Sequence, residues 1–427
     1  MGKLKCFEIV LNDTKTVFHP GEKVCGRVVV ELKGDTRTRW LRIFMRGVAK
    51  VHWTESRSTG NRLGSYTEHY NAEVEYFFKR QVLFGGEISD GRDTLSEGRH
   101  EFNFSFDLPM GGISTSFEGM HGSIRYWLKA EMGRPLSLTH KTKKAFTVIS
   151  NIDINKPEYQ MYVESSVEKT LCCWLCTSGP ISINARTDRR GYCPGESIAI
   201  SAEFDNHSNR TVIPYATLYQ TQTFYASGKS RIRKTKFTVL TGLPVHPRSS
   251  ANWDSQLLKI PAVSPSIMNC CVMKVEYFVN VALHIPGAYN LTLPLPIVIG
   301  TVPYRRAPTF HFTESRFYRE TQAQFERMSF LPLPPIPPPY RESITPPPPF
   351  EDPPTYVESV SGSVNMWDDD DDEEEGEEDT VNTMGDLTYT PMYTYVYNYR
   401  PPPAYSEEDP HRIQLCEVPV RHSRGDS

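Results

Sequence analysis

Hydrophobic and polar residues alternate with a period of two in many short runs along the first 300 residues. The clearest run covers residues 101–108, where Phe102, Phe104, Phe106 and Leu108 alternate with polar residues. Side chains of a strand point alternately to the two faces of a sheet, so these four share one buried face. Turn-forming residues separate the runs, and no long stretch repeats its apolar residues every 3.6 positions. The pattern predicts an all-β fold of sandwiches.

The first 300 residues also contain an internal repeat. Residues 18–32 resemble residues 192–204, and in both a Pro-Gly-Glu turn (20–22 and 194–196) leads into an alternating strand. Tyr126 and Tyr277 match later in the two copies. The two turns are 174 residues apart and the two tyrosines 151, so the first copy contains an insertion of 23 residues. The polar run 54–71 is the predicted place of this insertion, which would form either a binding loop or a plain hairpin tip.

The composition changes after residue 303. Residues 304–427 contain two proline-rich stretches and an acidic block, 368–379, in which 11 of 12 residues are Asp or Glu. Such a segment buries too little apolar surface to offset its ordering entropy. We therefore predict a first sandwich at 1–150, a linker at 151–179, a second sandwich at 180–303, and a disordered tail at 304–427.

The net charge of −4 hides a division between body and tail. The body carries 37 basic and 27 acidic residues, a net +10, whereas the tail carries 10 Arg and 24 acidic residues, a net −14. A basic body suits acidic partners such as phosphorylated peptides or an anionic membrane surface. The acidic tail could also fold back on the basic body and inhibit it, which is a hypothesis for experiment.

Three Pro-Pro-x-Tyr motifs lie in the tail. Proline presets an extended backbone that loses little entropy on binding, and its rings fit the aromatic groove of a WW domain. Separate motifs on one tether also allow avidity for tandem WW domains. The predicted WW-binding residues are Pro337, Pro338 and Tyr340, Pro353, Pro354 and Tyr356, and Pro402, Pro403 and Tyr405.

Motifs for other classes of function are missing from the sequence. It contains no P-loop, dinucleotide fingerprint, Gly-x-Ser-x-Gly or His-Glu-x-x-His string, so we expect no enzyme and no cofactor. No apolar run reaches the roughly 18 residues of a membrane span, and no secretory signal opens the chain. The nine cysteines include a cluster at Cys172, Cys173 and Cys176. No second half-site accompanies this cluster, so we expect no zinc, and either buried thiols or palmitoylation.

Longer strings resemble the α-arrestins, the arrestin-domain-containing family that includes the thioredoxin-interacting protein. The matching strings lie at residues 46–51, 53–57, 115–130, 171–182, 265–267 and 295–300. The resemblance covers essentially the whole body, and the motifs around Tyr356 and Tyr405 fall where the family keeps its pair. It implies two immunoglobulin-like arrestin domains in tandem.

The resemblance also implies an adaptor function. The tail would recruit WW-domain HECT-type ubiquitin ligases, and the body would hold membrane receptors or transporters as cargo, promoting ubiquitination, endocytosis and endosomal sorting. The expected location is the cytoplasm, peripheral at plasma membrane and endosomes, with no nucleic acid as partner. Two alternatives stay open: a retromer-like trafficking scaffold, and a redox regulator that binds thioredoxin. The thioredoxin-interacting member has a cysteine shortly before the tryptophan matching Trp253, whereas residues 248–253 contain none.

Overall fold

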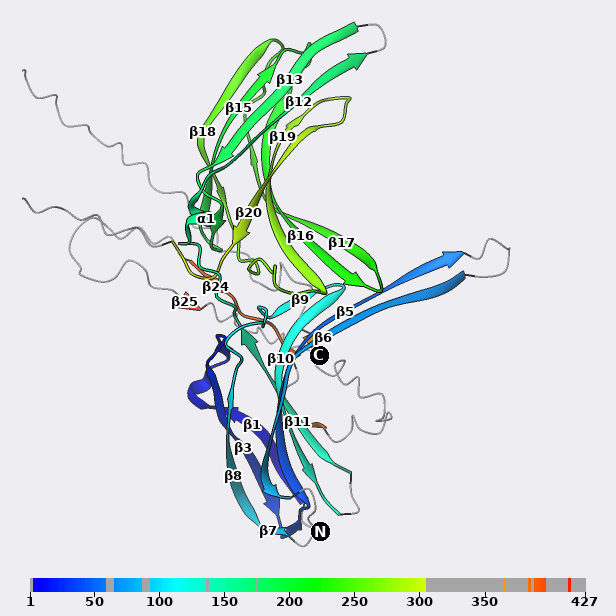
Figure 1. Ribbon diagram of the computed structural model, residues 1–427, viewed down its shortest axis with the longest axis vertical. Coiled ribbons are helices and arrows are strands. Elements are labelled where there is room, and N and C mark those ends of the chain that lie inside the picture. The colour runs from blue at the N-terminus through cyan, green and yellow to red at the C-terminus, as the bar shows by residue number, and fades with distance from the viewer. Residues whose placement is uncertain are drawn as a thin grey trace, which may run out of the picture. The chain divides into compact units, whose positions relative to one another are not determined.

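The computed structural model describes residues 3–58, 65–86, 93–135, 138–173, 176–304, 364–365, 383–384, 388–396 and 414–415. Residues Met1–Pro303 and Pro354–Ser427 belong to one compact unit, and Tyr304–Pro353 to another. Of the second unit only Tyr304 is described. Figure 1 draws the strands of the first unit.

Two sheets form the first sandwich. One has the strand order β1-β3-β8, from Lys3–Leu11, Lys23–Lys33 and Gly98–Asp107. The other has the order β2-β11-β10-β5-β6, from Val17–Phe18, His140–Val148, Gly122–Gly133, Trp40–Ser58 and Ser65–Gly85. Short strands at β4 (Thr36–Arg37), β7 (Thr94–Leu95) and β9 (Phe117–Gly119) complete it. On β8, Phe104 and Phe106 are buried as the alternation predicts.

Two further sheets form the second sandwich. The first has the order β12-β13-β15-β18, from Val163–Cys173, Cys176–Thr187, Ser197–Asn206 and Ser249–Lys259. The second has the order β14-β20-β19-β16-β17, from Gly191–Tyr192, Leu291–Ile299, Met273–His284, Ile213–Ala226 and Lys229–Thr241. Helix α1 (Pro157–Gln160) is a single turn. The all-β prediction is confirmed.

The range 151–179, predicted as a linker, contributes a strand to the second sandwich. It contains α1, the whole of β12 and the first residues of β13. β12 pairs with β13 from Val163 opposite Thr187 to Cys173 opposite Cys176. Cys172, Cys173 and Cys176 thus lie at the turn end of this hairpin, with side chains outside the described residues. The boundaries of the four ranges themselves stay a prediction.

The internal repeat is confirmed by matching hydrogen bonds at the two Pro-Gly-Glu turns. The Glu22 carboxylate accepts a hydrogen bond from the backbone N–H of His19 at 2.9 Å. The Glu196 carboxylate accepts one from the backbone N–H of Cys193, also at 2.9 Å. Glutamate therefore recurs at this position because its side chain closes the turn that launches each strand.

The middle residue of each turn is a glycine for a conformational reason. Gly21 has φ +84° and Gly195 has φ +92°, a region that residues with a Cβ rarely adopt. The surroundings differ. A Cβ on Gly21 would meet only the Met110 backbone and side chain at 3.5 Å or more, whereas one on Gly195 would collide with the backbone oxygen of Val396.

The insertion in the first copy lies mostly in one hairpin. β5 and β6 with their turn span residues 40–85, which is 46 residues, against 29 for β16 and β17 at 213–241. The described parts of the polar run 54–71, residues 54–58 and 65–71, lie in the outer part of the longer hairpin. Figure 1 shows β5 and β6 continuing beyond the neighbouring strands as a two-stranded ribbon.

Short described segments of the range predicted as a disordered tail are packed on the body. Tyr389, Tyr393 and Tyr395 are 8%, 7% and 4% exposed. Strand β22 (Thr383–Met384) pairs in parallel with Lys141 and Thr142 of β11. Short strands β21 (Val364–Asn365) with β23 (Thr388–Tyr389), and β24 (Thr394–Tyr395) with β25 (Gln414–Leu415), pair within the tail. For the rest of the range, disorder stays a prediction.

Candidate interaction surface

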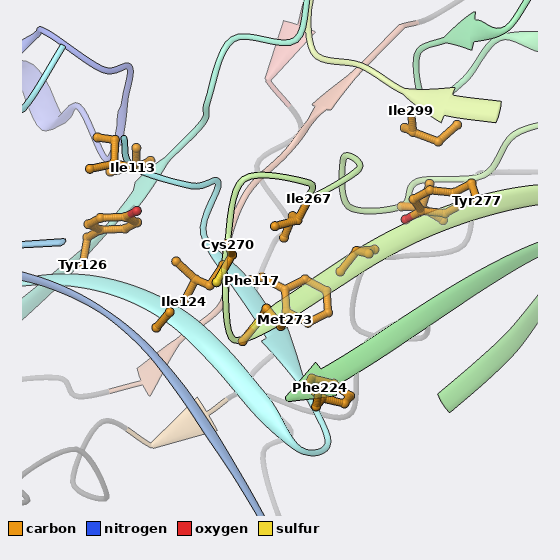
Figure 2. Close-up of a cluster of buried hydrophobic side chains, with 14 of the residues drawn as sticks. Ile113, Phe117, Ile124, Tyr126, Phe224, Ile267, Cys270, Met273, Tyr277 and Ile299 are labelled. Carbon is orange, nitrogen blue, oxygen red and sulfur yellow. The ribbon is translucent and has the colours of Figure 1, made fainter. Parts of the chain in front are cut away.

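The two sandwiches share one buried apolar cluster. Phe117 and Ile124 come from the first sandwich, and Phe224, Cys270 and Met273 from the second; all five belong to one hydrophobic core cluster. Figure 2 shows these side chains where β9 and β10 meet the start of β19. Because their burial depends on both sandwiches, separating the two would expose apolar surface on each.

Polar contacts accompany this apolar junction. The Ser114 hydroxyl donates a hydrogen bond of 2.9 Å to the side-chain oxygen of Asn269. The Asn269 amide nitrogen in turn donates to the backbone oxygen of Ile113 at 3.2 Å. Asn269 thus joins the two sandwiches by hydrogen bonds to residues up to 156 positions away in the chain.

The β5–β6 ribbon begins where its neighbour in the sheet ends. β10 pairs with β5 only as far as Val51, which lies opposite Gly122. Pairing of β5 with β6 continues to Ser58, which lies opposite Ser65. At the base of the ribbon the rings of Trp53 and Tyr70 stack with centroids 5.1 Å apart and planes at 17°. This apolar pair anchors an otherwise polar ribbon.

The β16–β17 hairpin of the second sandwich supports the ribbon. The Lys229 ammonium donates a hydrogen bond to the Tyr70 hydroxyl and lies 4.4 Å from the Tyr70 ring centroid. It is also 3.7 Å from the Glu68 carboxylate. The hydrogen bond with Tyr70 raises the pKa of Lys229, and the Glu68 charge also raises it by a smaller amount. Arg231 donates to the backbone oxygen of Thr54 at 3.5 Å.

A depression of about 770 Å³ lies beside the base of the ribbon. Its polar lining comes from β5, β6 and β10 and the turn before β10, and comprises Lys50, His52, Asn71, Glu73, His121, Ser123 and Arg125. The charges on its wall are held by ion pairs. Arg125 lies 2.7 Å from Glu118, and the two side chains are 11% and 4% exposed. Lys50 lies 3.6 Å from Glu73.

The electrostatic environment of the depression is basic. Burial lowers the pKa of the His121 imidazole, and the charges of Arg231 and Arg233 lower it further. The neutral imidazole is therefore favoured, in which one ring nitrogen can donate a hydrogen bond and the other can accept one. On the edge strand β17, exposed Lys234 and Lys236 alternate with these two arginines and so lie on the other face of the strand. Basic residues on an edge strand discourage pairing with another strand and favour contact with an anionic surface.

Comparison with known proteins gives this architecture a family. Residues 7–155 match the arrestin (or S-antigen) N-terminal domain, and residues 177–304 match the arrestin (or S-antigen) C-terminal domain. The chain belongs to the arrestin family. The two sandwiches are its arrestin domains, and the ribbon and depression lie on the N-terminal one.

Two arrestin-family relatives match almost the whole chain. Arrestin domain-containing protein 4 from Mus musculus is 34% identical over 419 residues, covering 96% of this chain and 94% of the relative. Thioredoxin-interacting protein from Homo sapiens is 31% identical over 413 residues, covering 96% and 97%. The similarity therefore extends beyond the two arrestin domains into the tail.

The predicted WW-binding residues are not covered by the described structure. All nine, from Pro337 to Tyr405, lie outside the described residues, so their role stays a prediction. The contact between the ribbon and β17 was not predicted from the sequence. The run of basic residues at 229–236 was a signal for it, but the contact joins residues 159 positions apart, which a local pattern cannot show.

The region around Trp253 is described throughout and bears on the redox alternative. Trp253 lies in β18 and packs edge-on against Phe204, with ring centroids 5.1 Å apart. Residues 248–252 contain no thiol. Among the described cysteines, Cys271 is exposed and Cys193 and Cys270 are buried. Within the described part of the arrestin chain, no helix is both long and apolar enough to cross a membrane.

Proposed function

We propose that this arrestin-family chain is an adaptor that joins membrane cargo to ubiquitin ligases. The arrestin body would bind receptors or transporters, and the tail would recruit WW-domain HECT-type ligases, promoting ubiquitination, endocytosis and endosomal sorting. The observation that carries the proposal is the repetition of Pro-Pro-x-Tyr, at Tyr340, Tyr356 and Tyr405, in one tail attached to an arrestin body.

The proposed cargo surface is the β5–β6 ribbon with the adjoining depression and β17. This surface combines a projecting polar hairpin, a polar depression of about 770 Å³ and the basic side chains of β17. Such a surface suits the acidic or phosphorylated cytoplasmic segments of membrane proteins, close to anionic headgroups. In this proposal the protein acts at the cytoplasmic face of the plasma membrane and endosomes.

The test is capture of the ligase by the full chain. Wild type, Tyr356→Ala with Tyr405→Ala, and the triple variant that adds Tyr340→Ala are compared for binding to an immobilised tandem WW domain. We expect the double variant to lose most binding and the triple variant all of it. Tyr289→Ala is the matched control, since Tyr289 is 91% exposed on the body. Undiminished binding by the triple variant would refute recruitment through these motifs.

A redox function is the second candidate, because one relative is named thioredoxin-interacting protein. The absence of a thiol from residues 248–252 argues against the family's mixed disulfide at that site. Cys271 is an exposed thiol that could replace it. Trapping with a thioredoxin that lacks its resolving cysteine, with Cys271→Ser as control, decides this candidate: no mixed disulfide leaves the adaptor function alone.

A further inference from the structure

A tyrosine-rich segment of the tail, residues 389–396, is seated on the arrestin body; we call it the docking segment. Its three tyrosines are as buried as core residues. On the first sandwich, Tyr389 packs in one apolar cluster with Val48 and Trp127, with Ala145 beside them. These residues belong to β5, β10 and β11, so the Tyr389 ring covers a sheet face.

Directional hydrogen bonds fix the docking segment on the first sandwich. The Tyr393 hydroxyl donates to the backbone oxygen of Ser116 at 2.8 Å. The Met392 backbone N–H donates to the Thr147 hydroxyl at 3.2 Å, and the Tyr389 hydroxyl lies 3.3 Å from the same oxygen. The body thus forms hydrogen bonds with both the backbone and the side chains of the segment, as in specific peptide recognition.

The segment then reaches the second sandwich at its Pro-Gly-Glu turn. The Val396 backbone N–H donates to the backbone oxygen of Pro194 at 2.8 Å. The Tyr395 ring lies over Gly195, where a Cβ would come within 3.0 Å of two ring atoms. At the equivalent glycine of the first copy, Gly21, the three atoms nearest to an added Cβ all belong to Met110. Among the described residues, the segment therefore contacts the second of the two repeated turns.

We propose that the body carries a docking groove for the tail segment 389–396, and that docking holds the Pro402-to-Tyr405 motif beside the body. Without docking, Tyr405 is tethered from Pro303 by 102 residues; with docking, from Val396 by nine. Nine residues reach at most roughly 30 Å. Effective concentration falls as about the −3/2 power of tether length. Docking therefore raises the effective concentration of the Pro402-to-Tyr405 motif near the body about 40-fold.

The inference rests on the proposed function only for what the motif recruits, and docking is tested separately. Hydrogen exchange of the Met392 and Val396 amides is measured in the full chain, in Gly195→Ala and in Gly21→Ala. Both substitutions strain a turn of the same conformation, but only the first obstructs the segment. We expect protected amides in wild type and Gly21→Ala, and at least tenfold faster exchange in Gly195→Ala. Random-coil exchange in wild type, or equal exchange in all three, overturns docking.

A photo-crosslinker at Tyr399, three residues beyond Val396, tests the tether. Crosslinks to the body near Pro194 are expected in wild type and at least tenfold fewer in Gly195→Ala; equal yields overturn the proposal. An isolated WW domain is expected to bind wild type and Gly195→Ala with the same Kd, because the motif itself is unchanged. If it binds neither, the recruiting function fails, whereas the exchange result still decides docking.

Discussion

Tyr126 and Tyr277 occupy equivalent positions in the two arrestin domains and make the same hydrogen bond. The Tyr126 hydroxyl donates to the backbone oxygen of Ser114, and the Tyr277 hydroxyl to that of Ser264, both at 2.6 Å. Both rings are fully buried, which raises the pKa of each phenol and keeps it a neutral donor. The repeat therefore preserves a buried polar contact as well as a strand pattern.

Removal of either hydroxyl should destabilise its own domain. We expect Tyr126→Phe and Tyr277→Phe each to lower the free energy of unfolding by about 1–3 kcal/mol, because each leaves a buried carbonyl oxygen without this donor. Tyr289→Phe, at an exposed site, should change it by less than about 0.5 kcal/mol. Urea denaturation followed by tryptophan fluorescence measures all three. A neutral Tyr277→Phe would show that Gln220 or Ser264 rearranges to replace the contact.

The glutamates of the two Pro-Gly-Glu turns should differ in importance although their turns match. The Glu196 side chain is 11% exposed and lies 3.0 Å from Arg189, whereas the Glu22 side chain is 35% exposed. Glu196→Ala removes a buried charge partner and should cost about 3–5 kcal/mol. Glu22→Ala should cost about 1 kcal/mol. Thermal unfolding of both variants checks the order, and a larger loss for Glu22→Ala would contradict it.

The stability of the first domain should fall in mild acid through His140. Burial lowers the pKa of His140 below 6.5, and the Arg134 charge adds to this. The unfolded chain then binds the proton more readily than the folded one, so this contribution to stability is complete above pH 6.5 and is lost as the pH falls below it. His140→Gln should flatten the pH dependence measured by urea midpoints between pH 7.5 and 5.5. His284→Gln, at an exposed site, should leave it unchanged.

The basic face of β17 should bind anionic membranes. We expect Lys234→Ala with Lys236→Ala to weaken binding to phosphatidylserine vesicles by about 2 kcal/mol, or roughly 30-fold, at about 1 kcal/mol per lysine. Lys33→Ala with Lys259→Ala makes the same charge change elsewhere on the surface. Vesicle sedimentation at two salt concentrations is the measurement. Equal loss for both pairs would mean that net charge, rather than this face, determines binding.

Phosphorylation of Tyr393 and docking of its segment should exclude each other. The hydroxyl donates to the Ser116 carbonyl in a site where the side chain is 7% exposed, and a phosphate dianion there would face a carbonyl oxygen without solvent. A chain made with phosphotyrosine at this position should show free exchange of the Val396 amide. Tyr393→Phe, which keeps the ring, should show only partial loss of protection.

The sequence was most informative where structure is local or repeated. The alternation at Phe104 and Phe106 predicted β8, the two Pro-Gly-Glu turns predicted the duplication, and the polar run 54–71 predicted the place of the insertion. These features follow from the strand period and from turn chemistry, which act over a few residues.

The sequence was least informative about contacts between distant segments. The docking segment was missed because average composition over 304–427 conceals three tyrosines within seven residues. Strand β12 lies in the range predicted as a linker; its residues are largely polar, as suits an edge strand with an exposed face. The contact of Lys229 with Tyr70 joins two domains, and the pattern of apolar and polar residues along one strand contains no information about such a contact.

The position of the docking segment after both domains gives the protein an order of assembly. The groove uses Ser116, Thr147 and Pro194, all of which leave the ribosome long before Val396. Domains fold as they emerge, at about 5–20 residues per second, so residues 304–396 follow over roughly 5–20 s. During that interval each nascent chain has both arrestin domains and an empty docking groove. A chain truncated anywhere in residues 304–388 would keep the groove empty permanently.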